Sequence, residues 1–210
     1  GTKIAANEFE TSVEDIIFVD GCFCVDGTDR SLSLLKVAQV AREVGRPLDT
    51  YQKWPRESMT FPNGAHVAEV VIDSETGTVN LKRYTAVDDY GVLVNPKIVE
   101  GQMHGAIAQG VGQALLEGVV YDDVSAQMLT GSFMDYAIPR ADNLPLFKTA
   151  FDGTTCTTNP LGVKGCGEAG TIAAPSAIAN AIVDALKEFG VTHIDGPATP
   201  EKIWNLIKFT

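Results

Sequence analysis

The stretch from Asn159 to Thr171 constrains this chain more than any other part of it. It holds four glycines within nine residues, at positions 162, 165, 167 and 170, around a single carboxylate, Glu168. Glycine lets the backbone turn sharply and lets other groups approach closely, so this density predicts a tight, backbone-lined loop rather than a flexible tether. An apolar segment follows over residues 172–186 and predicts a helix with Glu168 at its entrance.

Two interpretations of Glu168 stay open from spacing alone. The helix dipole stabilises a carboxylate at a helix start by about 0.3–1 kcal/mol, so Glu168 can be an ordinary helix-start acid or a functional group. The segment Gly165–Gly170 also satisfies the dinucleotide-binding pattern G-x-G-x-x-G. That fingerprint requires a hydrophobic strand leading into the first glycine, and residues 157–164 do not supply one. The context therefore argues against nucleotide binding.

The remaining chain alternates β-type and helical patterns. Helices are predicted over residues 3–9, 34–44, 97–117, 172–186 and from Pro200 onward, and Ser31 or Ser33 can cap the second of them. Strands or extended segments are predicted over residues 16–19, 22–25, 64–72, 78–87, 119–121, 128–139, 146–151 and 193–195. The first two flank Asp20–Gly21, which favours a type I′ hairpin turn, and residues 46–63 are expected to form an irregular connection. This pattern predicts an α+β fold, with antiparallel strands interleaved with helices.

The predicted helix over residues 97–117 contains glycines at positions 101, 105, 110 and 112, each of which costs about 0.5–1 kcal/mol relative to alanine. Close packing against another backbone or a flat ligand would explain them. Gln102 and Gln109 fall on nearly the same helix face, where an amide suits a polar heterocyclic ligand, although a surface glutamine is the commoner case. Ahead of this helix, Asp88 and Asp89 could act in acid–base chemistry, but at a strand end before Gly91 we expect a solvated turn.

Composition argues against several classes of partner. The net charge of −11 disfavours nucleic acid and anionic membrane surfaces, and no apolar run approaches the ~20 residues that span a bilayer. The chain has 45% hydrophobic and 20% charged residues, which is ordinary for a globular protein of one large or two small domains. The four cysteines lack metal-finger spacing and indicate a reducing, cytoplasmic setting. The three histidines are scattered singly, and we expect none to bind a metal.

Two motifs together resemble a known family. Residues 162–171 (GVKGCGEAGT) and residues 100–113 (EGQMHGAIAQGVGQ) are similar to the C-terminal part of the large catalytic subunit of molybdenum hydroxylases. This is the family of xanthine dehydrogenase, aldehyde oxidoreductase and aerobic carbon monoxide dehydrogenase. Residues 61–70, 130–140 and 191–195 resemble its carbon monoxide dehydrogenase-like branch, so the resemblance covers essentially the whole chain.

The resemblance implies a molybdenum cofactor bound through molybdopterin, in its cytosine dinucleotide form. In this family, a glutamate at the position of Glu168 is the general base toward the metal-bound hydroxyl, which attacks the substrate while hydride passes to a sulfido ligand. The glutamine matched by Gln102 hydrogen-bonds the pterin, and Gln109 is a second candidate. Backbone N–H groups near the cofactor are expected from Lys164, Gly165, Cys166 and Gly167. The thiol of Cys166 is interpreted as packing.

The resemblance also implies that residues 1–210 are the C-terminal portion of the molybdopterin-binding catalytic domain, with an upstream half absent. The expected partners are that upstream half, iron–sulfur and FAD-binding subunits or domains, and a small-molecule substrate, in an oligomer. The helical pattern that begins at Gly1 favours a piece cut from a larger subunit, which should be inactive by itself. The competing hypothesis is a non-catalytic assembly module, although Glu168 and its four glycines favour the enzyme. The motifs do not choose between carbon monoxide, aldehydes and heterocycles as substrate.

Overall fold

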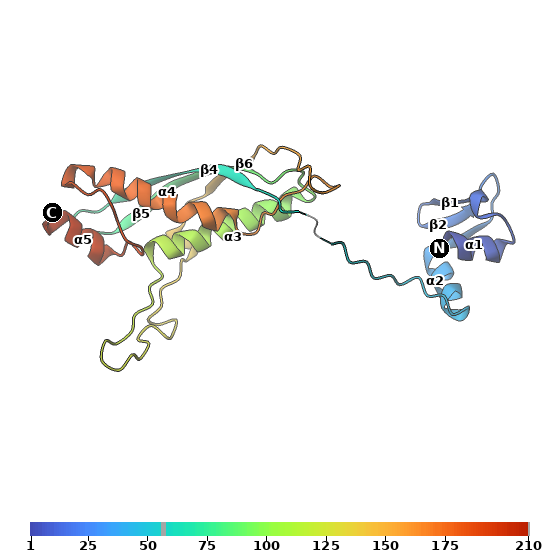
Figure 1. Cartoon of the computed structure of the whole chain (residues 1–210), viewed down its shortest axis with the longest axis horizontal. Helices are drawn as coiled ribbons and strands as arrows, with labels where there is room; N and C mark the ends of the chain where they lie inside the picture. Colours follow the sequence, from blue (N-terminus) through green and yellow to red (C-terminus); the bar gives the residue numbers. More distant parts are fainter. Residues whose placement is uncertain (56–57, 210) are drawn as a thin grey trace. The chain divides into compact units, whose positions relative to one another are not determined.

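The computed structural model describes residues 1–55 and 58–209 and divides the chain into two units, Gly1–Pro55 and Arg56–Thr210, each with its own hydrophobic core (Figure 1). Part of the connection predicted over residues 46–63, positions 56 and 57, lies outside the described residues. The described part up to Pro62 forms no helix or strand, as predicted. Within the described ranges, no helix is both long enough and apolar enough to cross a membrane.

In the first unit, a three-stranded antiparallel sheet packs with two helices. The strands are β1 (Ile16–Val19), β2 (Cys22–Val25) and β3 (Ser31–Ser33), and the helices are α1 (Thr2–Phe9) and α2 (Leu34–Glu43), with the 3-10 turn η1 (Val13–Asp15) between α1 and β1. Asp20 and Gly21 have φ values of 47° and 79°, which confirms the type I′ turn. The Ser33 side chain accepts a hydrogen bond from the amide of Lys36 and caps α2, although the sequence did not predict β3.

The second unit is built on a three-stranded sheet of order β4-β5-β6. The predicted long hairpin is β4 (Asn63–Ile72) paired antiparallel with β5 (Val79–Asp89), and β6 (Phe147–Phe151) pairs with the other edge of β5. The α+β fold is confirmed, with one difference from the expected pattern: β6 runs parallel to β5. A parallel pair needs a long crossover, and here residues 90–146, which include a helix, supply it.

Two long helices complete the core of this unit. They are α3 (Pro96–Leu115), capped by the Asn95 side chain, and α4 (Ala169–Ala185), which contacts both α3 and β4. The turn η3 (Lys187–Phe189) and the C-terminal α5 (Pro200–Phe209) follow, with Pro200 at the first helical position as predicted. Residues 193–195, where a short extended piece was expected, belong to no helix or strand.

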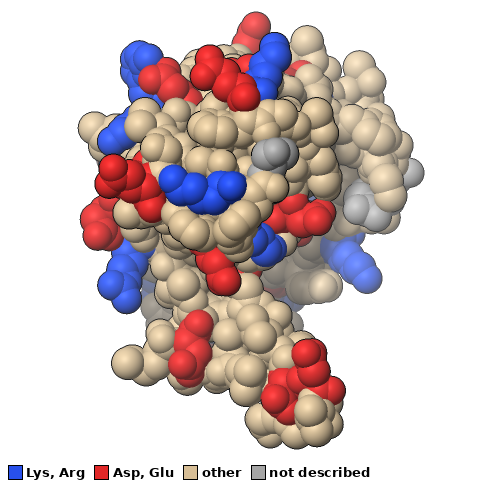
Figure 2. Space-filling model, turned by 90° about the vertical axis from the view of Figure 1, so that its left-hand side faces the viewer, with Lys and Arg blue, Asp and Glu red and all other residues tan. Residues whose placement is uncertain are grey.

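The chain between α3 and the turn η2 (Ala141–Asn143) leaves the body of the unit as an arm, residues 118–140 (Figure 1). A strand was expected over residues 119–121 and an extended segment over residues 128–139, but only a single Tyr121–Met128 bridge forms, and turns occupy residues 133–135. β-type residues form a strand only where a neighbouring strand receives their backbone groups, and the arm has no such neighbour among the described residues. Acidic side chains gather at the end of the arm (Figure 2), and its side chains include exposed Val124, Phe133 and Met134.

Candidate functional site

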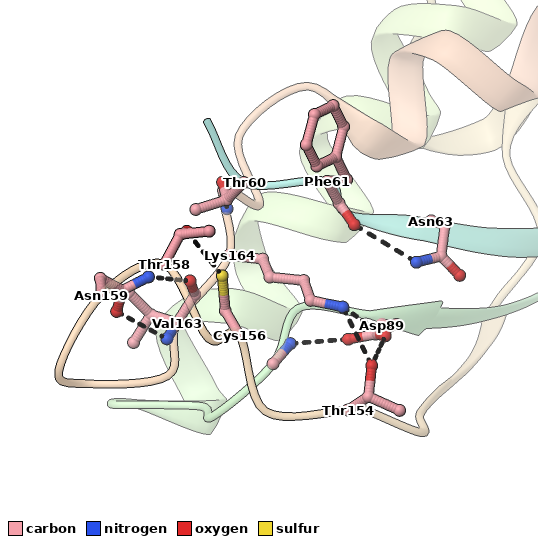
Figure 3. Close-up of polar contacts among 12 residues, drawn as sticks. Thr60, Phe61, Asn63, Asp89, Thr154, Cys156, Thr158, Asn159, Val163 and Lys164 are labelled. Carbon is pink, nitrogen blue, oxygen red and sulfur yellow. Dashed lines mark hydrogen bonds and ion pairs between the residues drawn. The ribbon is translucent and has the colours of Figure 1, made fainter. Parts of the chain in front are cut away.

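The glycine-rich stretch forms a folded loop whose first half is tied to neighbouring backbone (Figure 3). The Asn159 side chain donates to the Val163 carbonyl (2.9 Å) and accepts from the Val163 amide (3.1 Å). Gly162 has φ of 67°, and its carbonyl accepts hydrogen bonds from the amides of Val92 (2.9 Å) and Cys156 (3.0 Å). A residue with a side chain would be strained at this positive φ, so glycine is required here. No strand enters the loop, which confirms that the G-x-G-x-x-G match is not a dinucleotide fingerprint.

Lys164 is anchored through both its backbone and its side chain. Its amide donates to the Tyr90 carbonyl (2.9 Å), and its ammonium contacts the Asp89 carboxylate (2.6 Å) and the Thr154 hydroxyl (3.1 Å). Asp89 also accepts from the Thr154 hydroxyl (2.7 Å), as Figure 3 shows, and from the Gly91 amide (2.8 Å). The Lys164 ammonium, the Thr154 hydroxyl and the Gly91 amide hold the pKa of the Asp89 carboxyl well below its usual range.

The prediction that Asp88 and Asp89 form a solvated turn is wrong. Both are buried at the end of β5. Asp88 accepts from the Tyr90 hydroxyl (2.6 Å) and lies 3.1 Å from Nε2 of His66, whose Nδ1 lies 2.7 Å from the Tyr84 hydroxyl. Burial raises the pKa of both tyrosines, and the Asp88 carboxylate raises each further. The two carboxylates became buried because each has several hydrogen-bond donors, which a local pattern does not reveal.

The second half of the loop is open. The Gly165 amide makes a long contact with the Thr60 hydroxyl (3.3 Å), and the amides of Cys166, Gly167 and Glu168 have no acceptor among the described residues. A methyl group built on Gly165 or Gly167 would have no described atom within 4 Å. Cys166 packs on the edge of the core through its side chain, as predicted. The loop therefore presents unused N–H groups toward open space.

Glu168 is the N-cap residue of α4, as the sequence predicted. Its side chain makes no capping hydrogen bond and is exposed. The carboxylate therefore stands free at the positive end of a 17-residue helix, beside the unused amides of the loop. An ordinary helix-start acid would suit this place as well, so the position alone does not distinguish the two interpretations.

Helix α4 starts against the middle of α3. The Thr171 hydroxyl donates to the Ala106 carbonyl (2.9 Å), and a methyl group on Gly170 would lie 3.0 Å from the Met103 carbonyl. Further along both helices, a methyl group on Gly110 would lie 2.6 Å from the Cβ of Ala174. The two helices thus run side by side in the same direction, and Gly110 and Gly170 are required by their close approach (Figure 1).

Two of the other three glycines of α3 have a different environment, whereas a methyl group on the third, Gly112, would lie 2.8 Å from Cδ of Pro139. A methyl group on Gly101 or Gly105 would meet no described atom within 4 Å. Both lie exposed on the side of the helix that also presents the exposed amides of Gln102 and Gln109. The predicted explanations thus divide between the glycines: helix packing accounts for Gly110 and Gly170, whereas Gly101 and Gly105 leave room for a further group.

These residues fit a flat, polar, oxygen-rich cofactor. Glutamine amides both donate and accept, unused backbone N–H groups bind anionic oxygens, and uncovered glycines allow close approach. Of the loop residues predicted to offer amides, Lys164 differs from the others, because its N–H is bonded to the Tyr90 carbonyl and its ammonium to Asp89. Sequence reasoning missed the anchoring residues Asp89, Thr154, His66 and Tyr84. Only the adjacent pair Asp88–Asp89 gave a signal, and it was interpreted as a turn.

Comparison with known proteins agrees with this fit. Residues 1–145 match the family described as molybdopterin cofactor-binding domain. The chain is 38% identical to the nicotine 6-hydroxylase large subunit of Paenarthrobacter nicotinovorans, over 95% of this chain and 26% of that protein. It is 30% identical to the carbon monoxide dehydrogenase large chain of Hydrogenophaga pseudoflava, over 98% of this chain and 26% of that protein.

Solved structures give the same picture. Quinoline 2-oxidoreductase from Pseudomonas putida 86 superposes with a TM-score of 0.76 at 34% identity, covering 99% of this chain and 28% of that one. The Cu,Mo-CO dehydrogenase superposes with a TM-score of 0.73 at 28% identity, covering 98% of this chain and 26% of that one. The chain belongs to the molybdopterin cofactor-binding domain family, in the molybdenum hydroxylase group that its motifs resemble. It spans about a quarter of the length of these relatives.

Proposed function

We propose that this chain is part of the catalytic subunit of a molybdenum-dependent hydroxylase, with Glu168 as the general base. The observation that carries the proposal is the start of α4. There, an exposed carboxylate, unused backbone amides and uncovered glycines lie at a helix start that packs on α3, and α3 also presents two exposed glutamine amides. An assembly module would not need this combination of groups at one place, and this is the reason for preferring the enzyme.

The residues proposed to hold the cofactor come from α3 and the loop. Gln102 hydrogen-bonds the pterin, Gln109 is a second contact on the same face, and the backbone of Gly165, Cys166 and Gly167 lies against the cofactor's polar groups. Lys164 holds the loop in place instead of binding the cofactor directly. When bound, molybdenum-molybdopterin, in its cytosine dinucleotide form, supplies the two-electron redox chemistry of the reaction. Iron–sulfur and FAD groups are expected on other domains or subunits.

Glu168 contributes by accepting a proton at its carboxylate during substrate oxidation. In this chain the carboxylate is exposed and its side chain makes no capping bond, so no protein hydrogen bond described here must break before the proton is received. The Ile172 amide, which donates to the Glu168 carbonyl (3.1 Å), and the Thr171–Ala106 contact hold the C-terminal side of Glu168 in place. A fixed position is what a general base needs, because proton transfer requires hydrogen-bond contact with the group that loses the proton.

The substrate we propose is a small aromatic nitrogen heterocycle. Both kinds of comparison give higher identity to heterocycle enzymes than to carbon monoxide dehydrogenases: 38% for nicotine 6-hydroxylase against 30%, and 34% for quinoline 2-oxidoreductase against 28%. The proposed substrate class is narrower than the resemblance of residues 61–70, 130–140 and 191–195 to the carbon monoxide dehydrogenase-like branch would suggest. Assays of the complete enzyme with pyridine and quinoline derivatives, with carbon monoxide as the competing substrate, test it. Turnover of carbon monoxide alone would overturn it.

We further propose that residues 1–210 work as the C-terminal portion of a larger molybdopterin-binding domain in the cytoplasm, in an oligomer with iron–sulfur and flavin subunits. The exposed apolar side chains of the arm, residues 118–140, support an interface with a partner. Val124 (96% exposed), Met134 (93%) and Phe133 (84%) would be covered by that partner, because exposed apolar patches often mark interaction sites. The chain without its partners is expected to be inactive. Stoichiometric molybdenum and unaided turnover in the 210-residue protein would contradict this.

The proposal for Glu168 is tested by Glu168→Gln in the complete enzyme that contains this chain. Glutamine keeps the size of the side chain but cannot accept the proton, so turnover should fall by about 10²–10⁴-fold while molybdenum content stays the same. Glu201→Gln is the matched control, because Glu201 is an exposed acid in the first turn of another helix, α5. A Glu168→Gln enzyme with wild-type rate and full metal would leave Glu168 as a helix-start acid.

The proposal for Gln102 predicts a different defect. Gln102→Ala should lower molybdenum and pterin content, because the side chain is proposed to bind the cofactor and not the reacting atoms. Gln113→Ala, an exposed glutamine further along α3, is the control and should keep its full cofactor content. Equal cofactor content in both variants would remove Gln102 from the site.

A further inference from the structure

A buried ion pair connects the sheet to the loop that carries Glu168. Asp89 ends β5 and Lys164 lies in the loop, 75 positions later in the chain, with an Nζ to Oδ2 distance of 2.6 Å. Only 9% of each side chain is exposed to solvent. The exposed pair Arg83–Glu69, on the same sheet, is different: 69% and 51% of these side chains are exposed. Exposed pairs contribute little, whereas breaking a buried pair leaves a charge without its partner.

The hydrogen bonds around the pair show which partner depends more on the other. The Asp89 carboxylate accepts from Lys164, from the Thr154 hydroxyl and from the Gly91 amide, so it keeps two donors if Lys164 is removed. The Lys164 ammonium has Asp89 and, at 3.1 Å, the Thr154 hydroxyl. Removing the Asp89 charge by Asp89→Asn therefore leaves a buried ammonium with neutral partners only. An ammonium in that position would be expected to move toward water and carry its loop with it.

Lys164 is also the last firmly held residue before Glu168. Its amide is bonded to Tyr90, whereas the next amide, Gly165, makes only a 3.3 Å contact and those of Cys166, Gly167 and Glu168 have no acceptor among the described residues. Glycine at positions 165 and 167 adds backbone freedom. On its C-terminal side Glu168 is held by α4: its carbonyl accepts from the Ile172 amide (3.1 Å), and the Thr171 hydroxyl fixes the helix start on α3. The path of residues 165–168 is therefore set at its start by Lys164.

We propose that Asp89 is a positioning residue: through Lys164 it holds the loop so that the amides of residues 166–168 and the Glu168 carboxylate keep a fixed place at the start of α4. This rests on the proposed function of Glu168. The proposal assigns a role in turnover to Asp89, a residue of a distant strand that touches neither the cofactor nor the substrate. Figure 3 shows the chain of contacts from Asp89 and Thr154 to Lys164.

The first test measures the loop directly in the 210-residue chain, by amide hydrogen exchange. In Asp89→Asn, exchange of the Val163 and Lys164 amides, which are hydrogen-bonded to Asn159 and Tyr90, should rise roughly 10- to 100-fold, the factor expected when a hydrogen bond to a charged group is lost. Exchange in the interior of α4, residues 178–185, should not change, which separates a loosened loop from general unfolding. Cleavage by trypsin after Lys164 should accelerate as well. Glu69→Gln, which breaks the exposed pair, is the matched control and should leave both readouts at wild-type values.

The second test measures turnover in the complete enzyme. Asp89→Asn should lower kcat about tenfold or more with cofactor content retained, because a displaced base loses catalytic geometry. Lys164→Arg should retain most of the rate, since it keeps the charge. If Asp89→Asn does not fold, Lys164→Met removes the same pair while leaving the carboxylate two donors, and it should loosen the loop in the same way.

The outcomes separate this inference from the proposed function. Unchanged loop exchange in both Asp89→Asn and Lys164→Met overturns the inference. A looser loop with unchanged kcat also overturns it, provided that Glu168→Gln is inactive. If Glu168→Gln is fully active, the proposed function of Glu168 fails, and the exchange data alone then decide whether Asp89 positions the loop.

Discussion

The contact between α3 and α4 predicts that glycine-to-alanine substitution has opposite effects on stability at two positions of α3. Gly110 and Gly105 are both interior residues of α3. A methyl group at position 110 would lie 2.6 Å from the Cβ of Ala174 and 3.1 Å from Cδ of Pro175, whereas one at position 105 would meet no described atom within 4 Å. Carbon atoms pack at about 3.5–4.0 Å, so Gly110→Ala forces the two helices apart locally.

The magnitude follows from two opposing terms. Replacing an interior helical glycine by alanine gains about 0.5–1 kcal/mol of helix stability, and this gain applies at both positions. Overpacking at position 110 costs about 1–3 kcal/mol, because the neighbouring atoms belong to a short side chain and a proline ring that cannot rotate away. Gly105→Ala should therefore stabilise the unit and Gly110→Ala should destabilise it. The difference between the two variants isolates the steric cost of about 1–3 kcal/mol.

Urea unfolding of the 210-residue chain, followed by fluorescence, measures this difference. Trp204 lies in α5 and reports on the second unit, so a Trp54→Phe background removes the signal of the tryptophan in the first unit. With an m-value of about 2 kcal/mol/M, the unfolding midpoints of the two variants should differ by roughly 0.5–1.5 M at unchanged m. Equal midpoints would refute the close approach of α3 and α4. In the complete enzyme, Gly105→Ala should instead lower cofactor content, because the proposed site needs that space.

Three further outcomes are expected. The pKa of the Asp89 carboxyl is lowered from 3.8, so its ionised form stabilises the fold fully above that pH. In urea titrations, the difference in unfolding free energy between wild type and Asp89→Asn should therefore narrow as pH falls below 3.8, and a constant difference would contradict the buried pair. The pKa values of Tyr84 and Tyr90 are raised from 10.0, so these phenols should stay protonated as pH passes 10 and ionise only with unfolding. Reversible tyrosinate absorbance of the folded wild type near pH 10 that is missing from the Tyr84→Phe, Tyr90→Phe variant would count against this. The exposed arm should make the chain self-associate, and Phe133→Ser with Met134→Ser should reduce this in light scattering, whereas the exposed control Leu35→Ser should not; a wild-type chain that stays monomeric at high concentration would remove the arm as an interface.

Local signals in the sequence predicted most of the elements and part of the site. The Asp20–Gly21 turn, the Ser33 cap, the start of α5 at Pro200 and the placement of Glu168 at the start of α4 each depend on residues within one turn or hairpin, and each is confirmed. The glycines of α3 predicted a close approach of another group, and at Gly110 this is confirmed. Which of them contact α4 and which stay open depends on where a second helix lies, and no pattern within α3 carries that information.

The sequence by itself determined where the glycine-rich loop lies in the chain, which carboxylate it contains and which family its motifs resemble. The tertiary structure alone decided that Asp88 and Asp89 are buried instead of solvated, that β6 runs parallel to β5, and that residues 119–121 stay in a projecting arm instead of joining a sheet. The physical reason is the same each time. Burial of a carboxylate and pairing of a strand depend on donors and neighbours from distant segments: Thr154 and Lys164 reach Asp89 across 65 and 75 positions of the chain.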